Sequence, residues 1–158
     1  MDLNSRQVSD QILKHDIQFN TGMNILSIGG SDPSSGAGIQ SDIKTFSNHD
    51  TYGFTIVTAI TSQNTKKVTS IEPVSAKSLR AQLDSILSDF RVDAIKIGVV
   101  YNSQIIKIIY SKLRNIKVPI VIDPIIKSTT GATLLKKNAL HVYKKILIPL
   151  ADVITPNK

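Results

Sequence analysis

The sequence has 158 residues, of which 41% are hydrophobic and 20% are charged, and its net charge is +7 at pH 7. This composition is typical of one folded domain and unlike that of a disordered chain. The sequence has no cysteine, which excludes disulfides, thiolate chemistry and cysteine-ligated zinc. No apolar run approaches the roughly 18 residues of a membrane span, so we expect a cytoplasmic protein that does not enter a membrane.

The first 22 residues differ from the rest of the chain. They lack the apolar core of a signal peptide, and their three aspartates disfavour a transit peptide. Their apolar residues are spaced for a short amphipathic helix, and a flexible leader is the alternative. We therefore assign 1–22 as a leader and 23–158 as the folded domain.

From residue 23 onward, apolar runs alternate with segments that have helical periodicity. In chain order, the pattern predicts a strand at 23–28, a helix at 37–46, a strand at 54–60, a helix at 75–90, a strand at 94–100, a helix at 103–113, a strand at 119–122, a helix at 134–148 and a strand at 153–154. Continuous apolar strands separated by amphipathic helices indicate a parallel sheet covered on both faces. In such sheets ligands bind beyond the carboxyl ends of the strands, so the polar residues that follow each strand are the candidate site.

The loop after the first predicted strand, in the segment ILSIGGSDPSSGAGIQSD (25–42), looks at first like a phosphate loop. It lacks the lysine of the G-x-x-x-x-G-K-[ST] motif and the third glycine of G-x-G-x-x-G. Its glycines allow close backbone approach, and Asp32 and Ser35 are typical of turns and caps. Asp42, one turn into the helix, has two interpretations: it binds an amino group of a ligand, or it is a carboxylate favoured by the helix dipole.

Two other strand ends carry candidate residues. Gln63, in the polar run TSQNT, offers both a donor and an acceptor, which complements the edge of an aminopyrimidine. Asp123 directly follows a strand and precedes proline, where an aspartate commonly meets a metal ion or a phosphate. An ordinary turn is the alternative at both positions. None of the three histidines is expected to be catalytic.

The net charge of +7 raises the alternative of a nucleic-acid-binding module. The basic residues fall on or beside predicted helices, where they are spaced as solvated faces. The sequence has no tryptophan and few aromatic residues, so it lacks the stacking platform of single-strand binders. We therefore expect a small-molecule ligand and no nucleic acid.

Five segments occur in one order along the chain: GGSDPSSGAGIQSDIKTFS, YGFTIVTAITSQNT, AQLDSILSDFRVDAIKIG, VIDPII and LIPLADVITPN. Together they resemble the hydroxymethylpyrimidine/phosphomethylpyrimidine kinases of thiamine biosynthesis, which belong to the ribokinase-like family. The resemblance runs from about Asn24 to Asn157. Pyridoxal kinases are relatives with a similar TPN segment and remain an alternative, although GAGIQSDIKTFS and ITSQNT favour the pyrimidine branch.

The resemblance implies a three-layer α/β/α fold with a mostly parallel sheet, and a homodimer would be usual for the family. It also implies a kinase that uses ATP and Mg²⁺ to phosphorylate 4-amino-5-hydroxymethyl-2-methylpyrimidine and then its monophosphate. Carried over residue by residue, the expected roles are as follows: Asp42 and Gln63 hydrogen-bond the ring, Gly30 lets the backbone approach it, Thr61, Val99 and Ile126 line its pocket, and Asp123 and Asn157 face the ATP phosphates and the metal.

The sequence departs from the family pattern at three places. Ser35 stands where members often have glycine, Val99 where they often have methionine, and the segment 130–132 reads Thr-Gly-Ala instead of Ser-Gly-Asp.

The sequence also departs from the family in its length, since it ends at Lys158, directly after the TPN segment. Members of the family continue to a Gly-Thr-Gly segment that supplies the anion hole and the catalytic base. We therefore expect the base and the anion hole beyond Lys158 and assign no catalytic residue. The chain is then the N-terminal part of a longer kinase domain, truncated at its C-terminal side. An inactive remnant that retains pyrimidine binding is the alternative.

Overall fold

A six-stranded sheet organises residues 22–156, which are the residues that the computed structural model describes. Its strands are β1 (Asn24–Ser31), β2 (Tyr52–Gln63), β3 (Val68–Pro73), β4 (Ala94–Ile97), β5 (Ile120–Ile122) and β6 (Val153–Ile154). They lie side by side in the order β3-β2-β1-β4-β5-β6. All neighbours are parallel except β2 and β3, which are antiparallel. The predicted mostly parallel sheet is confirmed.

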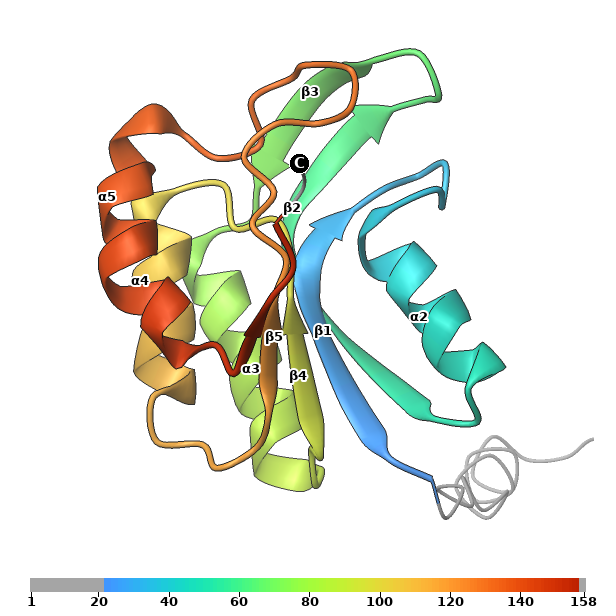
Figure 1. Cartoon of the computed structure of the whole chain (residues 1–158), viewed down its shortest axis with the longest axis vertical. Coiled ribbons are helices and arrows are strands. Elements are labelled where there is room, and N and C mark those ends of the chain that lie inside the picture. The colour runs from blue at the N-terminus through green and yellow to red at the C-terminus, as the bar shows by residue number, and fades with distance from the viewer. Residues whose placement is uncertain (1–21, 157–158) are drawn as a thin grey trace, which may run out of the picture.

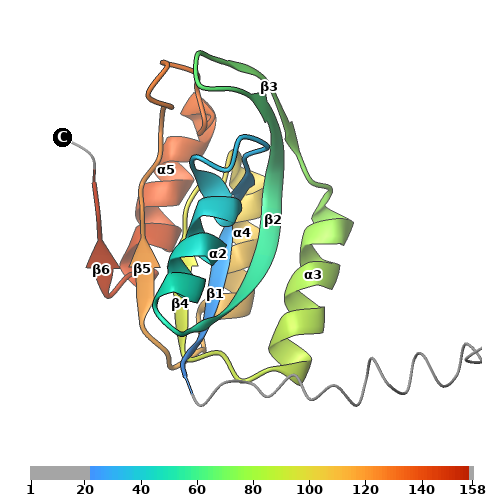
Figure 2. The ribbon, with the colours of Figure 1, turned by 90° about the vertical axis from the view of Figure 1, so that its right-hand side faces the viewer.

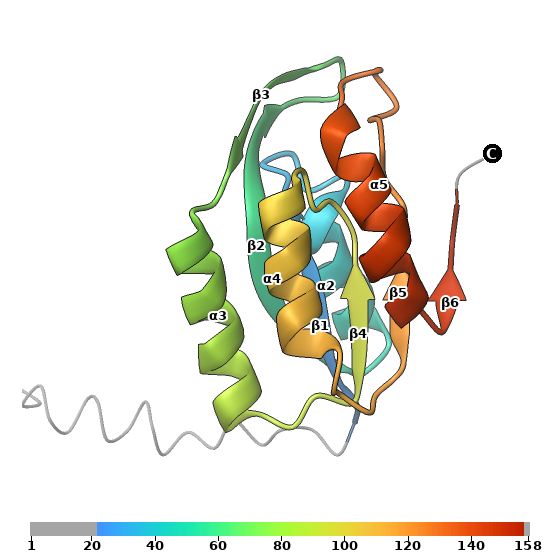
Figure 3. The ribbon, with the colours of Figure 1, turned by 90° about the vertical axis from the view of Figure 1, so that its left-hand side faces the viewer.

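Helices cover both faces of this sheet. Helix α2 (Gly38–Asn48) packs on β1 and β2 on one face, and α3 (Ala76–Asp89) and α4 (Ser103–Leu113) lie on the other (Figures 1 and 3). A helical run at 137–150 continues that second layer beside α4 and contains α5 (Leu140–Val142). The result is the expected three-layer α/β/α arrangement.

The hydrophobic core lies mainly between the sheet and the layer of α3, α4 and 137–150. Helix α4 begins at an Asn102 cap, whose side-chain oxygen accepts a hydrogen bond from the Ile105 amide at 3.0 Å. Nearly all of its apolar stripe is buried against the strands. The core includes Leu26, Ile28, Ile95, Ile97, Ile105, Ile106, Ile109, Leu113, Ile120 and Ile122. A shift of a central strand by one residue would turn these apolar side chains away from the core, so their burial fixes the register of the central strands.

Some boundaries differ from the sequence prediction. Strand β3 was not predicted, and β4 ends at Ile97 instead of residue 100. The helix predicted at 134–148 is an irregular run of short 3₁₀, α and π segments over 137–150. Pro149 lies in the last of these turns, where it offers no amide hydrogen to a regular helical ladder.

The β2–β3 hairpin and the loop after β5 lie at the same end of the sheet, next to the loop between β1 and α2 (Figure 2). This is the end at which the parallel strands terminate, and ligands of open α/β sheets bind there. No helix in the described part of the chain is long and apolar enough to cross a membrane.

Two of the sequence assignments fall outside the described residues. One is the leader at 1–22, of which only Gly22 is described. The other is the end of the chain, Asn157 and Lys158. The role expected for Asn157, and the catalytic base and anion hole expected beyond Lys158, therefore stay predictions.

Candidate functional site

A cleft of about 430 Å³ opens at the carboxyl ends of the strands. Three chain segments line it: the loop after β1 (30–38), the end of β2 with the turn into β3 (61–68), and the loop after β5 (125–134). Val99, just after β4, contributes to its wall. The volume lies in the range of small-molecule sites, and the position is the one expected for ligands of parallel sheets.

Asp32 organises the loop after β1. Its Oδ1 accepts hydrogen bonds from the Ser34 amide and hydroxyl, both at 2.8 Å, and its Oδ2 accepts one from the Ala37 amide at 2.9 Å. The Asp32 backbone oxygen accepts the Ser35 amide at 3.0 Å. Burial acts to raise the pKa of Asp32, but hydrogen bonds from Ser34, Ala37 and Gln63 outweigh it and lower that pKa. The carboxyl is therefore ionised at neutral pH.

This arrangement bears on the phosphate-loop interpretation. In a phosphate loop, backbone amides of the loop point at the ligand. Here the amides of Ser34 and Ala37 donate to the chain's own carboxylate instead. The loop thus presents a negative charge, Asp32, to the cleft and not a cradle for an anion.

Two glycines of this loop have separate roles. Gly38 has φ +63°, and a Cβ there would lie 2.4 Å from the Gly30 carbonyl oxygen, so this close approach requires glycine. A Cβ on Gly30 would instead meet Val99 at 3.5 Å, which is ordinary contact. Packing therefore does not require glycine at position 30, which lines the cleft.

Four of the predicted site residues lie together on the cleft, namely Gly30, Thr61, Gln63 and Val99. The Thr61 hydroxyl donates to the Ser31 carbonyl oxygen at 2.8 Å, which ties the ends of β1 and β2 together. Gln63 lies on the same cleft as Asp32 and contributes to the lowered pKa of that carboxyl. The structure thus joins residues from three different strand ends in one wall.

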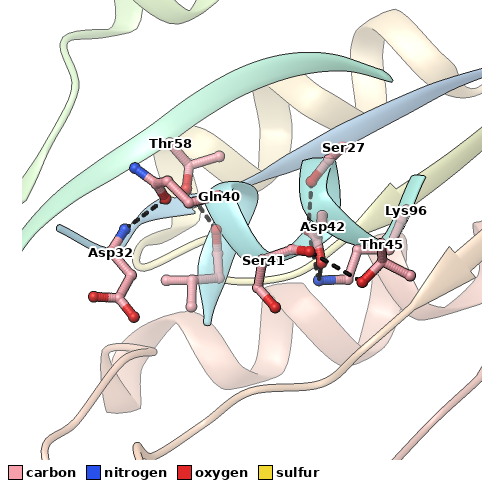
Figure 4. A network of polar contacts seen from close by, with 9 residues as sticks. Ser27, Asp32, Gln40, Ser41, Asp42, Thr45, Thr58 and Lys96 are labelled. Atoms are coloured by element: carbon pink, nitrogen blue, oxygen red, sulfur yellow. Dashed lines mark hydrogen bonds and ion pairs between the residues drawn. The ribbon is translucent and has the colours of Figure 1, made fainter. Parts of the chain in front are cut away.

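Asp42 lies on α2 and faces the sheet, outside the residues that line the cleft (Figure 4). Its Oδ2 accepts the Ser27 hydroxyl at 2.6 Å, and both of its oxygens accept from Lys96 Nζ, at 3.1 and 3.0 Å. Both carboxylate oxygens are thus engaged within the protein. The expected contact of Asp42 with a ligand ring stays a prediction, and it requires Asp42 to exchange one of these partners.

The charges of Lys96 and Asp42 both act on Asp123. Burial raises the pKa of Asp123, the positive charge of Lys96 opposes this rise, and the negative charge of Asp42 adds to it. Gly98 leaves room for the lysine, because a Cβ there would lie 3.2 Å from Lys96 Nζ. Lys96 was not predicted as a site residue, although a lysine inside an otherwise apolar buried strand is the signal that identifies such a residue.

The loop after β5 contributes to the cleft differently from the prediction. Ile126 is 42% exposed and does not line the cleft, whereas its neighbour Ile125 does. Four polar residues that were not predicted also line the cleft: Lys127, Ser128, Thr129 and Thr130. Their signal is a polar, glycine-containing run directly after a buried strand.

The acidic residues limit how a metal ion could be held. The described residues contain no group of three or more His, Cys, Asp or Glu side chains that could enclose a metal. Mg²⁺ commonly binds through one or two carboxylates together with substrate phosphates. The single Asp123 carboxylate at a strand end fits such a shared site and does not fit a site made of protein ligands alone.

A mostly parallel sheet between two helical layers, with a small-molecule cleft at its carboxyl edge, is shared by many α/β proteins, and similarity to solved structures identifies it here as the fold of the ribokinase-like vitamin kinases. Solved structures agree. A phosphomethylpyrimidine kinase from Clostridium difficile is 44% identical with a TM-score of 0.79, over 85% of this chain and 59% of that protein. A Staphylococcus aureus pyridoxal kinase in complex with AMP-PCP and pyridoxal is 32% identical with a TM-score of 0.75, over 87% of this chain and 49% of that one.

The phosphomethylpyrimidine kinase family profile matches residues 32–158, and the chain belongs to this family. The hydroxymethylpyrimidine/phosphomethylpyrimidine kinase of Rhizobium meliloti is 47% identical over 132 residues, which are 84% of this chain and 50% of that protein. The chain spans about half the length of the curated relatives it matches.

Proposed function

We propose that this chain takes part in the ATP-dependent phosphorylation of 4-amino-5-hydroxymethyl-2-methylpyrimidine and of its monophosphate, in the synthesis of thiamine diphosphate. The observation that carries the proposal is the wall formed by Gly30, Thr61, Gln63 and Val99 at the ends of three strands. A flat ring can lie against the bare backbone of Gly30, while the Gln63 amide reads its polar edge. Membership of the phosphomethylpyrimidine kinase family supports the same substrate.

Asp42 and Ile126 have weaker support as ring contacts. Asp42 contacts the ring in this proposal only if its carboxylate exchanges its hydrogen bond with Ser27 or with Lys96 for one with the ligand. Ile126 would have to turn inward from an exposed position. Its neighbour Ile125 already provides an apolar side chain to the wall of the cleft.

ATP and Mg²⁺ are proposed as the phosphoryl donor and its metal ion. Relatives solved with ADP and with AMP-PCP support a nucleotide. Asp123 would meet the metal or the phosphates from the end of β5, and Asn157 is proposed for the same side. When bound, Mg²⁺–ATP supplies the phosphoryl group and neutralises part of its charge. No catalytic base is assigned among the described residues, and we propose that the base and the anion hole lie beyond Lys158.

The remaining proposals concern partners and location. We propose a small-molecule substrate and no nucleic acid, a cytoplasmic location, and a homodimer. The first follows from a cleft of about 430 Å³, which suits a small ring better than a nucleic-acid strand. The cytoplasmic location and the homodimer are proposed from the family alone.

Pyridoxal phosphorylation is a second candidate function. It is favoured by the similarity to the Staphylococcus aureus pyridoxal kinase solved with pyridoxal. Both substrates are flat six-membered rings with a hydroxymethyl group, so the size of the cleft does not separate them. The polar edge does, because pyridoxal carries no ring amino group for the acceptor of Gln63.

Titration calorimetry with both compounds tests the proposal. We expect the hydroxymethylpyrimidine to bind at least tenfold more tightly than pyridoxal. The opposite order would favour the second candidate, and binding of neither would contradict both. Because the base and the anion hole are proposed beyond Lys158, binding without phosphorylation by residues 1–158 is expected both of the proposed function and of an inactive remnant. DNA binding that falls steeply with salt would favour a basic nucleic-acid module.

A further inference from the structure

Two charged residues line the cleft in the described part of the chain, and they belong to different loops. Asp32 is on the loop after β1, and Lys127 is on the loop after β5. The Asp32 carboxylate accepts hydrogen bonds from the amides of Ser34 and Ala37, so these donors are not available to a ligand. An anionic group of a ligand is therefore repelled by the loop after β1 and attracted by the loop after β5.

The positive charge of Lys127 is available to a ligand. Lys127 is exposed and lines the cleft. The ion pairs among residues 22–156 all join other residues, and the Lys127 ammonium group donates no hydrogen bond to that part of the chain. A lysine side chain carries three donors on a flexible stem, so this ammonium group can follow a ligand oxygen within its reach.

The loop after β5 also offers backbone donors. Ser128 begins a β-turn, which is closed by the Gly131 amide donating to the Ser128 carbonyl oxygen at 2.9 Å. The Ser128 hydroxyl accepts the Ala132 amide at 3.0 Å and holds the turn in place. The amides of the two central residues, Thr129 and Thr130, donate to no described residue. Successive free amides in a turn form an anion-binding arrangement.

We propose that Lys127 and the turn at Thr129 and Thr130 form an anion subsite that binds the phosphate group of a phosphorylated pyrimidine. This inference rests on the proposed function, because the same cleft would hold the ring at Gly30 and Gln63. A phosphate monoester has a charge of about −1.5 to −2 at pH 7 and three strong acceptor oxygens. Those oxygens match one ammonium group and two amides, and charge-assisted hydrogen bonds of this kind are the strong ones.

The subsite would distinguish the two proposed substrates. The hydroxymethylpyrimidine offers a neutral hydroxyl group to Lys127, whereas its monophosphate offers an anion. The phosphate of the monophosphate is also the group that receives the second phosphoryl group, so the subsite would position the acceptor for that step. We therefore expect the cleft to bind the monophosphate more tightly than the hydroxymethylpyrimidine.

Titration calorimetry with these two compounds tests the subsite on the wild-type chain and on Lys127→Gln. We expect the wild type to bind the monophosphate at least fivefold more tightly than the hydroxymethylpyrimidine. In Lys127→Gln the affinity for the monophosphate should fall at least fivefold, and the affinity for the hydroxymethylpyrimidine should change less than twofold. Lys137→Gln removes the same charge from an exposed position outside the cleft and should keep both affinities.

An unchanged monophosphate affinity in Lys127→Gln, or an equal loss for both compounds, would overturn the inference while leaving the proposed function intact. The terminal phosphate of a nucleotide is the other source of such an anion. A fivefold loss of AMP-PCP affinity in Lys127→Gln, with the monophosphate unaffected, would assign the subsite to the nucleotide and overturn the inference as well.

If the wild type binds neither pyrimidine, the proposed function fails instead, and inorganic phosphate tests the subsite by itself. At constant ionic strength, we expect phosphate to cause saturable NMR shifts of the Thr129 and Thr130 backbone amides of the wild type. The phosphate affinity should fall at least fivefold in Lys127→Gln. Absence of these shifts at millimolar phosphate would overturn the inference, and this measurement on the wild type also decides the case in which Lys127→Gln does not fold.

Discussion

Lys96 Nζ lies 3.0 Å from Asp42 Oδ2, although the two residues are 54 positions apart in the sequence. The lysine projects from β4 and the aspartate from α2, which packs on the neighbouring strands β1 and β2, so the pair ties α2 to the sheet beside the site (Figure 4). Their side chains are only 24% and 17% exposed. Each charge therefore depends on the other for its solvation.

Removing the lysine should destabilise the fold more than removing a surface charge. Lys96→Met leaves Asp42 without its cation in a partly buried position, and we expect the free energy of unfolding to fall by about 2 kcal/mol. Lys112→Met is the matched control, because Lys112 pairs with the more exposed Asp84 and should cost less than about 1 kcal/mol. Urea denaturation of both variants measures the difference, and equal losses would contradict this account.

Asp123 gives a prediction that depends on pH. Its pKa lies above the ordinary value of 3.8, so the folded protein binds this proton more tightly than the unfolded chain does. The contribution of Asp123 to the free energy of unfolding therefore decreases as the pH rises from about 3.8 through the raised pKa. Asp123→Asn should be more stable than the wild type at pH 7, and this advantage should disappear near pH 3.

Denaturant titrations at both pH values check the Asp123 prediction, with Asp89→Asn as a control at the end of α3. A loss of stability at pH 7 would contradict it. If Asp123 also meets the phosphates or the metal, the more stable variant should bind Mg²⁺–ATP less well. Higher stability together with weaker Mg²⁺–ATP binding in Asp123→Asn is expected if the charge of Asp123 serves function at the expense of stability.

Gly30→Ala should weaken ligand binding with little effect on the stability of the fold. The new Cβ would make only ordinary contacts, the nearest at 3.5 Å from Val99, so we expect the free energy of unfolding to change by less than about 1 kcal/mol. The methyl group nevertheless occupies the face that a ring would use, and ligand affinity should fall at least tenfold. Gly29→Ala is the control, because its Cβ would face Ile39 under α2. Equal affinities of the two variants would remove Gly30 from the site.

Ser35 has φ 56°, a left-handed conformation that costs most residues about 1 kcal/mol and glycine almost nothing. Ser35→Gly should therefore raise the free energy of unfolding by up to about 1 kcal/mol in a denaturant titration. Ser34→Gly should act in the opposite direction, because it removes a hydroxyl that donates to Asp32. A destabilised Ser35→Gly would show that the loop does not carry this strain.

The sequence predicted the parallel strands and most helices because each has its own periodic signal. The stripe of α4 and the apolar runs of β1 and β5 are local patterns, and the structure places them close to the predicted bounds. Strand β3 was missed because Val68–Pro73 mixes polar residues with a proline and has no clear alternation. Its pairing with β2 is a tertiary feature.

The site was only partly predictable because some of its contacts, like the pairing of β3 with β2, are tertiary features. Periodicity indicates the strand end at which Gln63 stands, whereas Gly30, Thr61 and Val99 were predicted as site residues from the resemblance to the kinase family. The partner of Asp42 does not follow from spacing, because Lys96 comes from a strand 54 positions away. Nor did spacing reveal that Asp32 holds its own loop through the amides of Ser34 and Ala37.

The central claim is that the cleft beside Gln63 binds the aminopyrimidine ring. The most direct measurement is an NMR titration of the nitrogen-15-labelled chain with 4-amino-5-hydroxymethyl-2-methylpyrimidine. We predict saturable shifts of the Gln63 side-chain amide and of the Gly30 and Thr61 backbone amides, with the surface around Asp84 unaffected. Shifts confined to other parts of the chain, or no shifts at millimolar ligand, would contradict the claim.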